Sequence, residues 1–210
     1  MKIALVTPVF PPYAAGMATV AEAHARILSD DGHDVTVFAP LGRSGLKMNQ
    51  RYHVQSLPPR LRYGNAAYVP ALRSYLCDGK FDRIVLEYPF IGGAEVFLFN
   101  DIPAAPLRLY YHMDLVGQGI MRPAFATYNR LILPRVLEKF PRVAVSSLDY
   151  ATSGLLRGAI AFHQEKFTEV PIGVYFSTTI TPPAVIPSGV EGSRKAPCIL
   201  LGPDSRFLSS

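Results

Sequence analysis

Lys2-Ile3-Ala4-Leu5-Val6-Thr7 begins the stretch 1–40, which decides the fold of this chain. This apolar, partly β-branched run predicts a strand that ends at Pro8. A helical pattern follows over about residues 17–30, and Asp34-Val35-Thr36-Val37-Phe38-Ala39 is a second apolar run. Strand, loop, helix and strand in this order predict a βαβ unit. Because both strands are apolar on both faces, we expect them to lie in a buried parallel sheet.

The loop between the first strand and the helix is the first candidate binding element. A right-handed crossover places this loop and the start of the helix at the carboxyl edge of the sheet, where ligands bind in open α/β folds. Gly16 lies at the start of the helix. Free N–H groups and the helix dipole favour a phosphate there, and a glycine allows close approach to the backbone. We therefore expect Gly16 to face a phosphate, with a plain turn glycine as the alternative.

The rest of the chain alternates between strand and helix patterns. Strands are expected over residues 52–57, 82–87, 106–111, 142–146 and 167–170, and helices over 66–77, 123–140 and 148–156. Pro134 predicts a kink in the second of these helices, and Ser147 is placed to cap the third. The alternation predicts an α/β fold with a doubly wound parallel sheet and helices on both faces.

Bulk composition limits the class of protein and its partners. The chain has 210 residues, 49% of them hydrophobic, which is typical of one packed domain. The net charge of +5 suggests an anionic partner such as a phosphate, a nucleotide or a lipid headgroup. Basic residues alternate with apolar ones and do not form a patch with stacking aromatics, so nucleic acid is not expected. Cys77 and Cys198 lack a CxxC partner, which indicates reduced thiols and a cytoplasmic protein.

Two segments differ from this pattern. Residues 42–50 are polar and contain glycine, which predicts a mobile basic loop. Residues 177–210 have the Pro/Gly/Ser composition of a linker. Within them, Cys198-Ile199-Leu200-Leu201-Gly202 is compatible with the first strand of a further domain. We therefore divide the chain into a domain over residues 1–176 and a disordered or truncated tail over 177–210.

Several motifs, in their order and spacing, resemble the amino-terminal domain of family 4 glycosyltransferases, which have the two-domain GT-B fold. The motifs are the Pro-Pro and small-residue loop in 7–17, the Leu-x-x-x-Gly-His-x-Val-x-Val pattern in 28–37 (in the form Leu28-Ser29-Asp30-Asp31-Gly32-His33-Asp34-Val35-Thr36-Val37), the strand Phe81-Asp82-Arg83-Ile84-Val85, Tyr111-His112-Met113-Asp114, Val145-Ser146-Ser147-Leu148-Asp149-Tyr150, and Val170-Pro171-Ile172-Gly173-Val174. The sequence departs from the family pattern at Ala15, Ile172 and Tyr175, where Gly, Asn and Asp are usual. The resemblance implies a Rossmann-like domain that forms one half of a GT-B fold.

The resemblance also implies an activity, which is hexosyl transfer from a nucleotide-sugar to an acceptor hydroxyl of a glycan or lipid. GT-B enzymes generally need no bound metal or other cofactor, because the helix dipole and basic side chains stabilise the leaving diphosphate. His112 matches the family histidine that contacts the transferred sugar or stabilises charge near the anomeric carbon. A histidine satisfied within the core is the alternative.

Further site residues are expected around these positions. Ala15 and Gly16 would face the donor phosphate. Tyr13, Glu87, Tyr88 and Asp114 are candidates for acceptor binding. For Glu87 the alternative is a solvated strand end. For Asp114 the alternatives are to orient His112 or to cap a turn. His24 and His33 have no convincing metal-ligand partners, so no metal site is predicted.

In the family, the donor site lies mainly in a second Rossmann-like domain with a basic residue and a Glu-x7-Glu pattern. This sequence carries neither, so we expect it to lack tight donor binding on its own. The alternatives are an inactive acceptor-binding module or truncated remnant, and an unrelated nucleotide-binding α/β domain.

The segment 123–140 is the candidate for contact with a membrane. It carries or adjoins several basic residues, which favours contact with the inner face of an anionic membrane and with a lipid-linked acceptor. A core-packed helix with a basic solvated face is the alternative. The basic residues in or beside the segment 123–140 are Arg122, Arg130, Arg135, Lys139 and Arg142.

Overall fold

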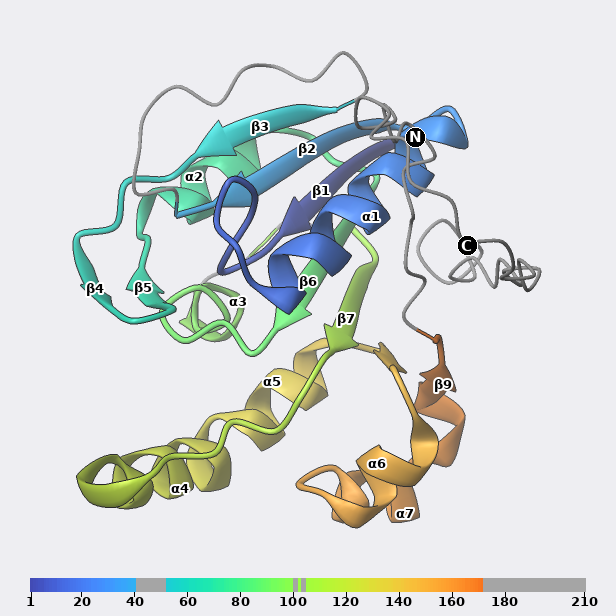
Figure 1. Ribbon diagram of the computed structural model, residues 1–210. Helices are drawn as coiled ribbons and strands as arrows, with labels where there is room; N and C mark the ends of the chain where they lie inside the picture. The colour runs from blue at the N-terminus through green and yellow to red at the C-terminus, as the bar shows by residue number, and fades with distance from the viewer. Residues whose placement is uncertain (41–51, 100–101, 103–104, 172–210) are drawn as a thin grey trace, which may run out of the picture.

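The computed structural model describes residues 1–40, 52–99, 102 and 105–171. Its centre is a seven-stranded sheet with the order β3-β2-β1-β6-β7-β8-β9, in which every neighbouring pair is parallel (Figure 1). The predicted α/β fold with a doubly wound parallel sheet is therefore confirmed. The strands are β1 Lys2–Val6, β2 Asp34–Ala39, β3 His53–Ser56, β6 Arg83–Tyr88, β7 Leu107–Tyr111, β8 Arg142–Val145 and β9 Phe167–Glu169.

Helices cover both faces of this sheet. Helix α1, Gly16–Asp30, packs on one face, and α2 and α3 lie on the other (Figure 1). The remaining helical segments follow β7 and β8 in the chain. The elements not yet given are α2 Ala71–Asp78, α3 Val96–Phe99, η1 Gly119–Met121, α4 Arg122–Leu131, α5 Leu133–Lys139, α6 Leu148–Ser153, α7 Arg157–Phe162 and η2 Gln164–Lys166.

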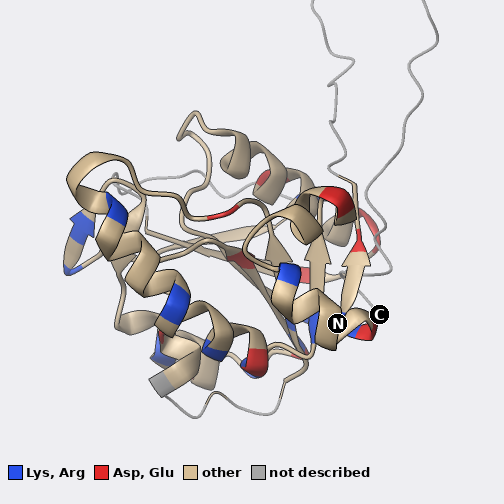
Figure 2. Ribbon diagram, turned by 90° about the horizontal axis from the view of Figure 1, so that it is seen from below, with Lys and Arg blue, Asp and Glu red and all other residues tan. Residues whose placement is uncertain are grey.

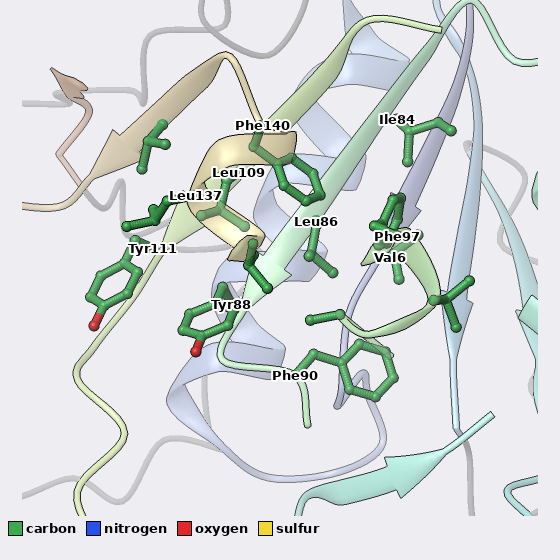
Figure 3. Packing of buried hydrophobic residues seen from close by; sticks show 14 of the residues in the cluster. Val6, Ile84, Leu86, Tyr88, Phe90, Phe97, Leu109, Tyr111, Leu137 and Phe140 are labelled. Atoms are coloured by element: carbon green, nitrogen blue, oxygen red, sulfur yellow. The ribbon is translucent and has the colours of Figure 1, made fainter. Parts of the chain in front are cut away.

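Each face of the sheet has its own hydrophobic core, because side chains alternate between the two faces of a strand. On the α1 face, Ile3 and Leu5 pack with Ala21, Ala25 and Leu28 of the helix. The apolar stripe of α1 therefore buries the central strands. Figure 3 shows the core of the opposite face, where aromatic side chains fill the space between sheet and helices. They include Tyr88, Phe90, Phe97, Tyr111 and Phe140.

The structure corrects the helix predicted over 66–77. Residues 66–68 form strand β5, Ala66–Tyr68, which pairs with β4, Leu61–Tyr63, in a separate antiparallel hairpin. Helix α2 begins only after Pro70 and ends at Asp78, with Gly79 as its C-cap residue. The hairpin is fixed by a long-range contact, because the Ala67 N–H donates to the Ile91 carbonyl oxygen at 2.9 Å. The spacing of apolar residues within 66–77 carries no information about this contact with a distant residue.

The helix predicted over 123–140 is two helices, α4 and α5, which meet at Ile132. Pro134 lies in the first turn of α5, where its missing N–H breaks no intrahelical hydrogen bond. The cap at Ser147 is confirmed, since its Oγ accepts the Tyr150 N–H at 3.3 Å. Helix α7 lies beyond the helix predicted over 148–156 and was not predicted.

The loop predicted over 42–50 and the tail predicted over 177–210, including Cys198, lie outside the described residues. Among the helices that the structure does describe, none has the length and apolarity needed to cross a membrane. Within the same part of the chain, no three His, Cys, Asp or Glu residues are grouped so that they could hold a metal ion.

Candidate functional site

A buried carboxylate lies between two histidines at the carboxyl edge of the sheet. Glu87 is the second-to-last residue of β6 and is completely buried. Its Oε1 is 2.8 Å from Nδ1 of His24 on α1. Its Oε2 is 2.5 Å from Nε2 of His112, which directly follows β7. The parallel pairing of β6 with β7 and the packing of α1 over them bring these three residues together.

The electrostatics of this cluster keep the carboxyl group ionised. Burial by itself would raise the pKa of Glu87. The charge of His24 and the hydrogen bonds from both histidines outweigh burial and lower this pKa to about 2. A carboxylate only accepts hydrogen bonds, so the ring nitrogens that face it carry protons. His24 therefore donates from Nδ1, and His112 donates from Nε2.

The ring of Tyr110 packs against both histidine rings. Its ring centroid lies 4.6 Å from that of His24 and 4.8 Å from that of His112. The Tyr110 hydroxyl donates to the Val170 carbonyl oxygen at 2.7 Å, so the ring is anchored at its far end as well. Nε2 of His24 is buried and has no hydrogen-bond partner among the described residues. Among the described residues, the His24 ring therefore makes its hydrogen bond to Glu87 alone.

His112 is more enclosed than a residue that lines an open cleft. Its side chain is 3% exposed. Because Nε2 is committed to Glu87, Nδ1 is the ring nitrogen left for a partner outside the cluster. A neutral ring accepts a hydrogen bond at Nδ1, and a protonated ring donates one.

The start of α1 lies at the same edge of the sheet, since only β6 separates β1 from β7. No side chain caps this end, and its first turn contains no acidic residue. Gly16 is exposed, and a Cβ atom added there would meet no atom within 4 Å. Tyr13 is 46% exposed beside it. Ala15 precedes the helix with an extended backbone, and its carbonyl oxygen accepts the Thr19 N–H at 3.1 Å.

The residues expected to contact an acceptor occupy different environments. Glu87 and Tyr88 are both completely buried, so neither has a surface to present to an acceptor in this arrangement. Glu87 supports His112 instead. Tyr88 points to the opposite face of the sheet, where it stacks on Tyr111 with ring centroids 5.4 Å apart (Figure 3).

Asp114 ties the loop after β7 to the turn between α6 and α7. Its Oδ1 accepts the Tyr111 hydroxyl at 2.7 Å, and its Oδ2 accepts the Leu155 N–H at 3.1 Å. Its own N–H donates to the Tyr150 hydroxyl at 3.0 Å. These hydrogen bonds correspond to the predicted alternative in which Asp114 caps a turn. None of the described hydrogen bonds of Asp114 connects it to His112.

A cavity of about 1300 Å³ lies between the pair α4–α5 and the pair α7–η2. Its lining begins at Asp114, two residues after His112, and extends to Arg142 and Phe167 at the starts of β8 and β9. Much of the lining is apolar, and Arg122 and Arg130 of α4 also contribute. Figure 2 shows the basic positions along α4 and α5. We call this cavity the helix groove.

Sequence reasoning missed His24, which was weighed only as a metal ligand. The signal that identifies it is its place on the helix. His24 lies between Ala21 and Leu28, three and four residues away, on the apolar stripe of α1. A titratable residue on a buried stripe needs a polar partner inside the protein. The neighbouring strands offer the Glu87 carboxylate as that partner.

Comparison with solved structures identifies the fold. The catalytic domain of starch synthase IV from Arabidopsis thaliana, bound to ADP and acarbose, is similar with a TM-score of 0.61 and 14% identity, over 82% of this chain and 52% of that one. Apo UGT2 from Phytolacca americana is similar with a TM-score of 0.53 and 12% identity, over 85% of this chain and 53% of that one. The chain thus spans about half the length of these GT-B proteins and has the Rossmann-like fold of one half.

Family membership follows from the sequence match. No curated protein matches this chain. The family described as "Glycosyl transferase 4-like domain" matches residues 15–158, which cover α1 and the carboxyl-edge residues Glu87 and His112. The chain therefore belongs to the glycosyl transferase 4-like domain family.

Proposed function

We propose that this chain forms one wall of a sugar-transfer site, in which a hexosyl group passes from a nucleotide-sugar to an acceptor hydroxyl. The observation that carries the proposal is the position of His112, held by Glu87 at the carboxyl edge that also contains the open first turn of α1. Membership of a glycosyltransferase family supports the reaction class.

The first turn of α1 would face the diphosphate of the donor. Its N–H groups and the helix dipole attract an anion, and Gly16 leaves room for close approach. The same groups would stabilise the charge that develops on the leaving diphosphate, without a metal ion or other cofactor in this proposal. Ala15 and Tyr13 flank this position. The family resemblance assigns most other donor contacts to a second domain, so we assign only this turn to the donor here.

His112 would contact the transferred sugar through Nδ1. Glu87 fixes the ring orientation and keeps the proton on Nε2, so a neutral His112 presents a lone pair to a sugar hydroxyl. When the ring is protonated, the Glu87 carboxylate balances its charge. In both states the role of Glu87 is to position His112, because its own oxygens are buried.

The helix groove supports an acceptor with an apolar part. Its lining starts next to His112, and its volume exceeds the range of about 300–1,000 Å³ found for pockets of drug-sized ligands. We propose that it holds the hydrocarbon part of a lipid acceptor, while a glycan acceptor would use the carboxyl edge alone. Arg122 and Arg130 would then contact an anionic membrane at the cytoplasmic face. Cosedimentation with anionic vesicles tests the membrane contact.

The experiment that tests the transfer is release of nucleoside diphosphate from a panel of UDP-, GDP- and ADP-sugars with glycan and lipid acceptors. The chain is assayed alone and with the carboxyl-terminal domain of a related glycosyltransferase supplied in trans. We expect His112→Ala to lower transfer by about a hundredfold or more. His33→Ala, which lies outside the site, should leave transfer unchanged. Transfer that His112→Ala leaves intact, or no transfer under any condition, would contradict the proposal.

A further inference from the structure

Three arginines lie on adjacent strands near the amino edge of the sheet, opposite the edge that holds His112. They are Arg83 of β6, Arg108 of β7 and Arg142 of β8. Arg108 and Arg142 are direct partners in the register of β7 and β8. Arg83 lies two residues before Val85, the register partner of Arg108 in β6 and β7. With strands about 4.8 Å apart and a rise of about 3.3 Å per residue, the three positions span about 12 Å.

The alternation of side chains along the strands places all three residues on the face that α1 covers, and Arg142, at the start of β8, also lines the helix groove. Each arginine is followed, two residues later, by a residue of the core beneath α1, and residues two apart on a strand share a face. These following residues are Val85, Tyr110 and Ala144. The cluster therefore shares a sheet face with Glu87 and His24. From Arg108 to His112 is four residues along the chain, or about 13 Å.

Arg83 is the anchor of the cluster. It is 8% exposed, and its Nε and Nη1 atoms are buried without a hydrogen-bond partner in the part of the chain that the structure describes. Burial lowers the pKa of Arg83, and the charge of Asp82 partly offsets this. Asp82 is exposed and already accepts the Lys2 backbone N–H at 2.7 Å, so it does not neutralise the guanidinium directly.

The three charges also act on one another. Burial is the larger effect on Arg108, and the charges of Arg83 and Arg142 lower its pKa further. Arginine nevertheless stays protonated in proteins, so the cluster remains cationic. Arg142 is exposed, which leaves the cluster open to a ligand on the β8 side.

Arg83 is a buried cation with unpaired N–H groups among the described residues, which is costly, and an anion would offset that cost. We propose that Arg83, Arg108 and Arg142 form a binding site for a phosphate group, separate from the position assigned to the donor diphosphate. A guanidinium fork matches two oxygens of a phosphate. One arginine can saturate a carboxylate, whereas a phosphate offers oxygens and charge to several arginines. The cluster therefore fits a phosphate better than a carboxylate.

The test is thermal unfolding of the 210-residue chain in phosphate-free buffer, titrated with inorganic phosphate, with glycerol 2-phosphate, or with sodium chloride at equal ionic strength. We expect both phosphate compounds to raise the melting temperature and chloride to have a much smaller effect. Tighter binding of glycerol 2-phosphate would identify an ester as the ligand, and equal binding would identify the phosphate group alone. Equal effects of phosphate and chloride would overturn the proposal.

Variants separate this site from general charge effects. Arg83→Met should be more stable than the wild type without phosphate, because it removes an unpaired buried charge, and should lose the phosphate effect. Arg142→Gln, at an exposed position, should fold normally and bind phosphate roughly tenfold or more weakly. Arg157→Gln, an exposed position on α7, should behave as the wild type. Unchanged phosphate binding in Arg142→Gln would refute the site, and every readout is independent of sugar transfer.

Discussion

Glu87→Gln is the substitution that tests the buried histidine cluster most directly. The wild-type carboxylate accepts hydrogen bonds from both His24 and His112. Glutamine has nearly the same shape, but its amide offers one acceptor and one donor. The ring N–H group of one histidine would then face the amide N–H group of the glutamine, unless that histidine carries its proton on the other ring nitrogen. The variant therefore removes a buried charge and leaves one contact mismatched.

The structure sets the size of the expected loss. The pKa of Glu87 is lowered from its ordinary 4.5 to about 2, which corresponds to roughly 3 kcal/mol of folding free energy at neutral pH. Because the folded pKa lies below the unfolded one, this contribution is complete above about pH 4.5 and is lost as the pH falls toward 2. At pH 3 less than half of this contribution should remain.

The assay is urea unfolding of wild type and Glu87→Gln at pH 7 and pH 3. We expect the variant to be less stable by about 3 kcal/mol at pH 7 and by clearly less at pH 3. Glu165→Gln is the matched control, because Glu165 faces His163 at 3.7 Å in an exposed pair, and it should cost less than about 1 kcal/mol. A Glu87→Gln protein as stable as the wild type at pH 7, or a loss of equal size at both pH values, would refute this account.

Gly92→Ala should lower the free energy of unfolding by about 2 kcal/mol or more, because Gly92 has a φ of +92° and an added Cβ would lie 2.3 Å from the Ala67 carbonyl oxygen. Gly158→Ala, in helix α7 with no atom within 4 Å, should instead raise it by about 0.5–1 kcal/mol, and urea unfolding that ranks the two variants the other way would contradict both expectations. In vesicle cosedimentation, replacing both Arg122 and Arg130 by Gln should weaken binding to anionic vesicles about thirtyfold, at about 1 kcal/mol for each charge near the surface. Equal binding by variant and wild type, or equal binding to neutral vesicles, would argue against the membrane contact.

Local pattern was sufficient for the strands of the parallel sheet. The strands around Leu5, Val37, Val85 and Leu109 are apolar runs with turn residues at their ends, and the structure contains each of them. Prediction failed where a distant contact overrides a local preference. The hairpin at Ala66–Tyr68 has helical spacing in sequence but forms through pairing with β4 and a hydrogen bond from Ala67 to the following loop.

The candidate site was only partly accessible from sequence. His112 and Gly16 follow buried strands of a parallel sheet, so their position at one edge could be predicted from chain order and crossover handedness alone. The degree of burial of the site residues could not be predicted, because it depends on which side chains of other elements cover each residue. Glu87, expected at an acceptor surface, is covered by α1 and by the residues around it.

The sequence by itself determined the alternation of the sheet strands with helices, the parallel sheet and the edge at which His112 lies, because these follow from local periodicity and from general rules of chain connection. Only the tertiary structure decided which polar groups meet. His24 and Glu87 are 63 residues apart, and Glu87 and His112 are 25 apart. Their contacts depend on the rotation of α1 about its axis and on the register of β6 against β7. Packing across the whole sheet sets this rotation and this register, so they cannot be predicted from a short stretch of sequence.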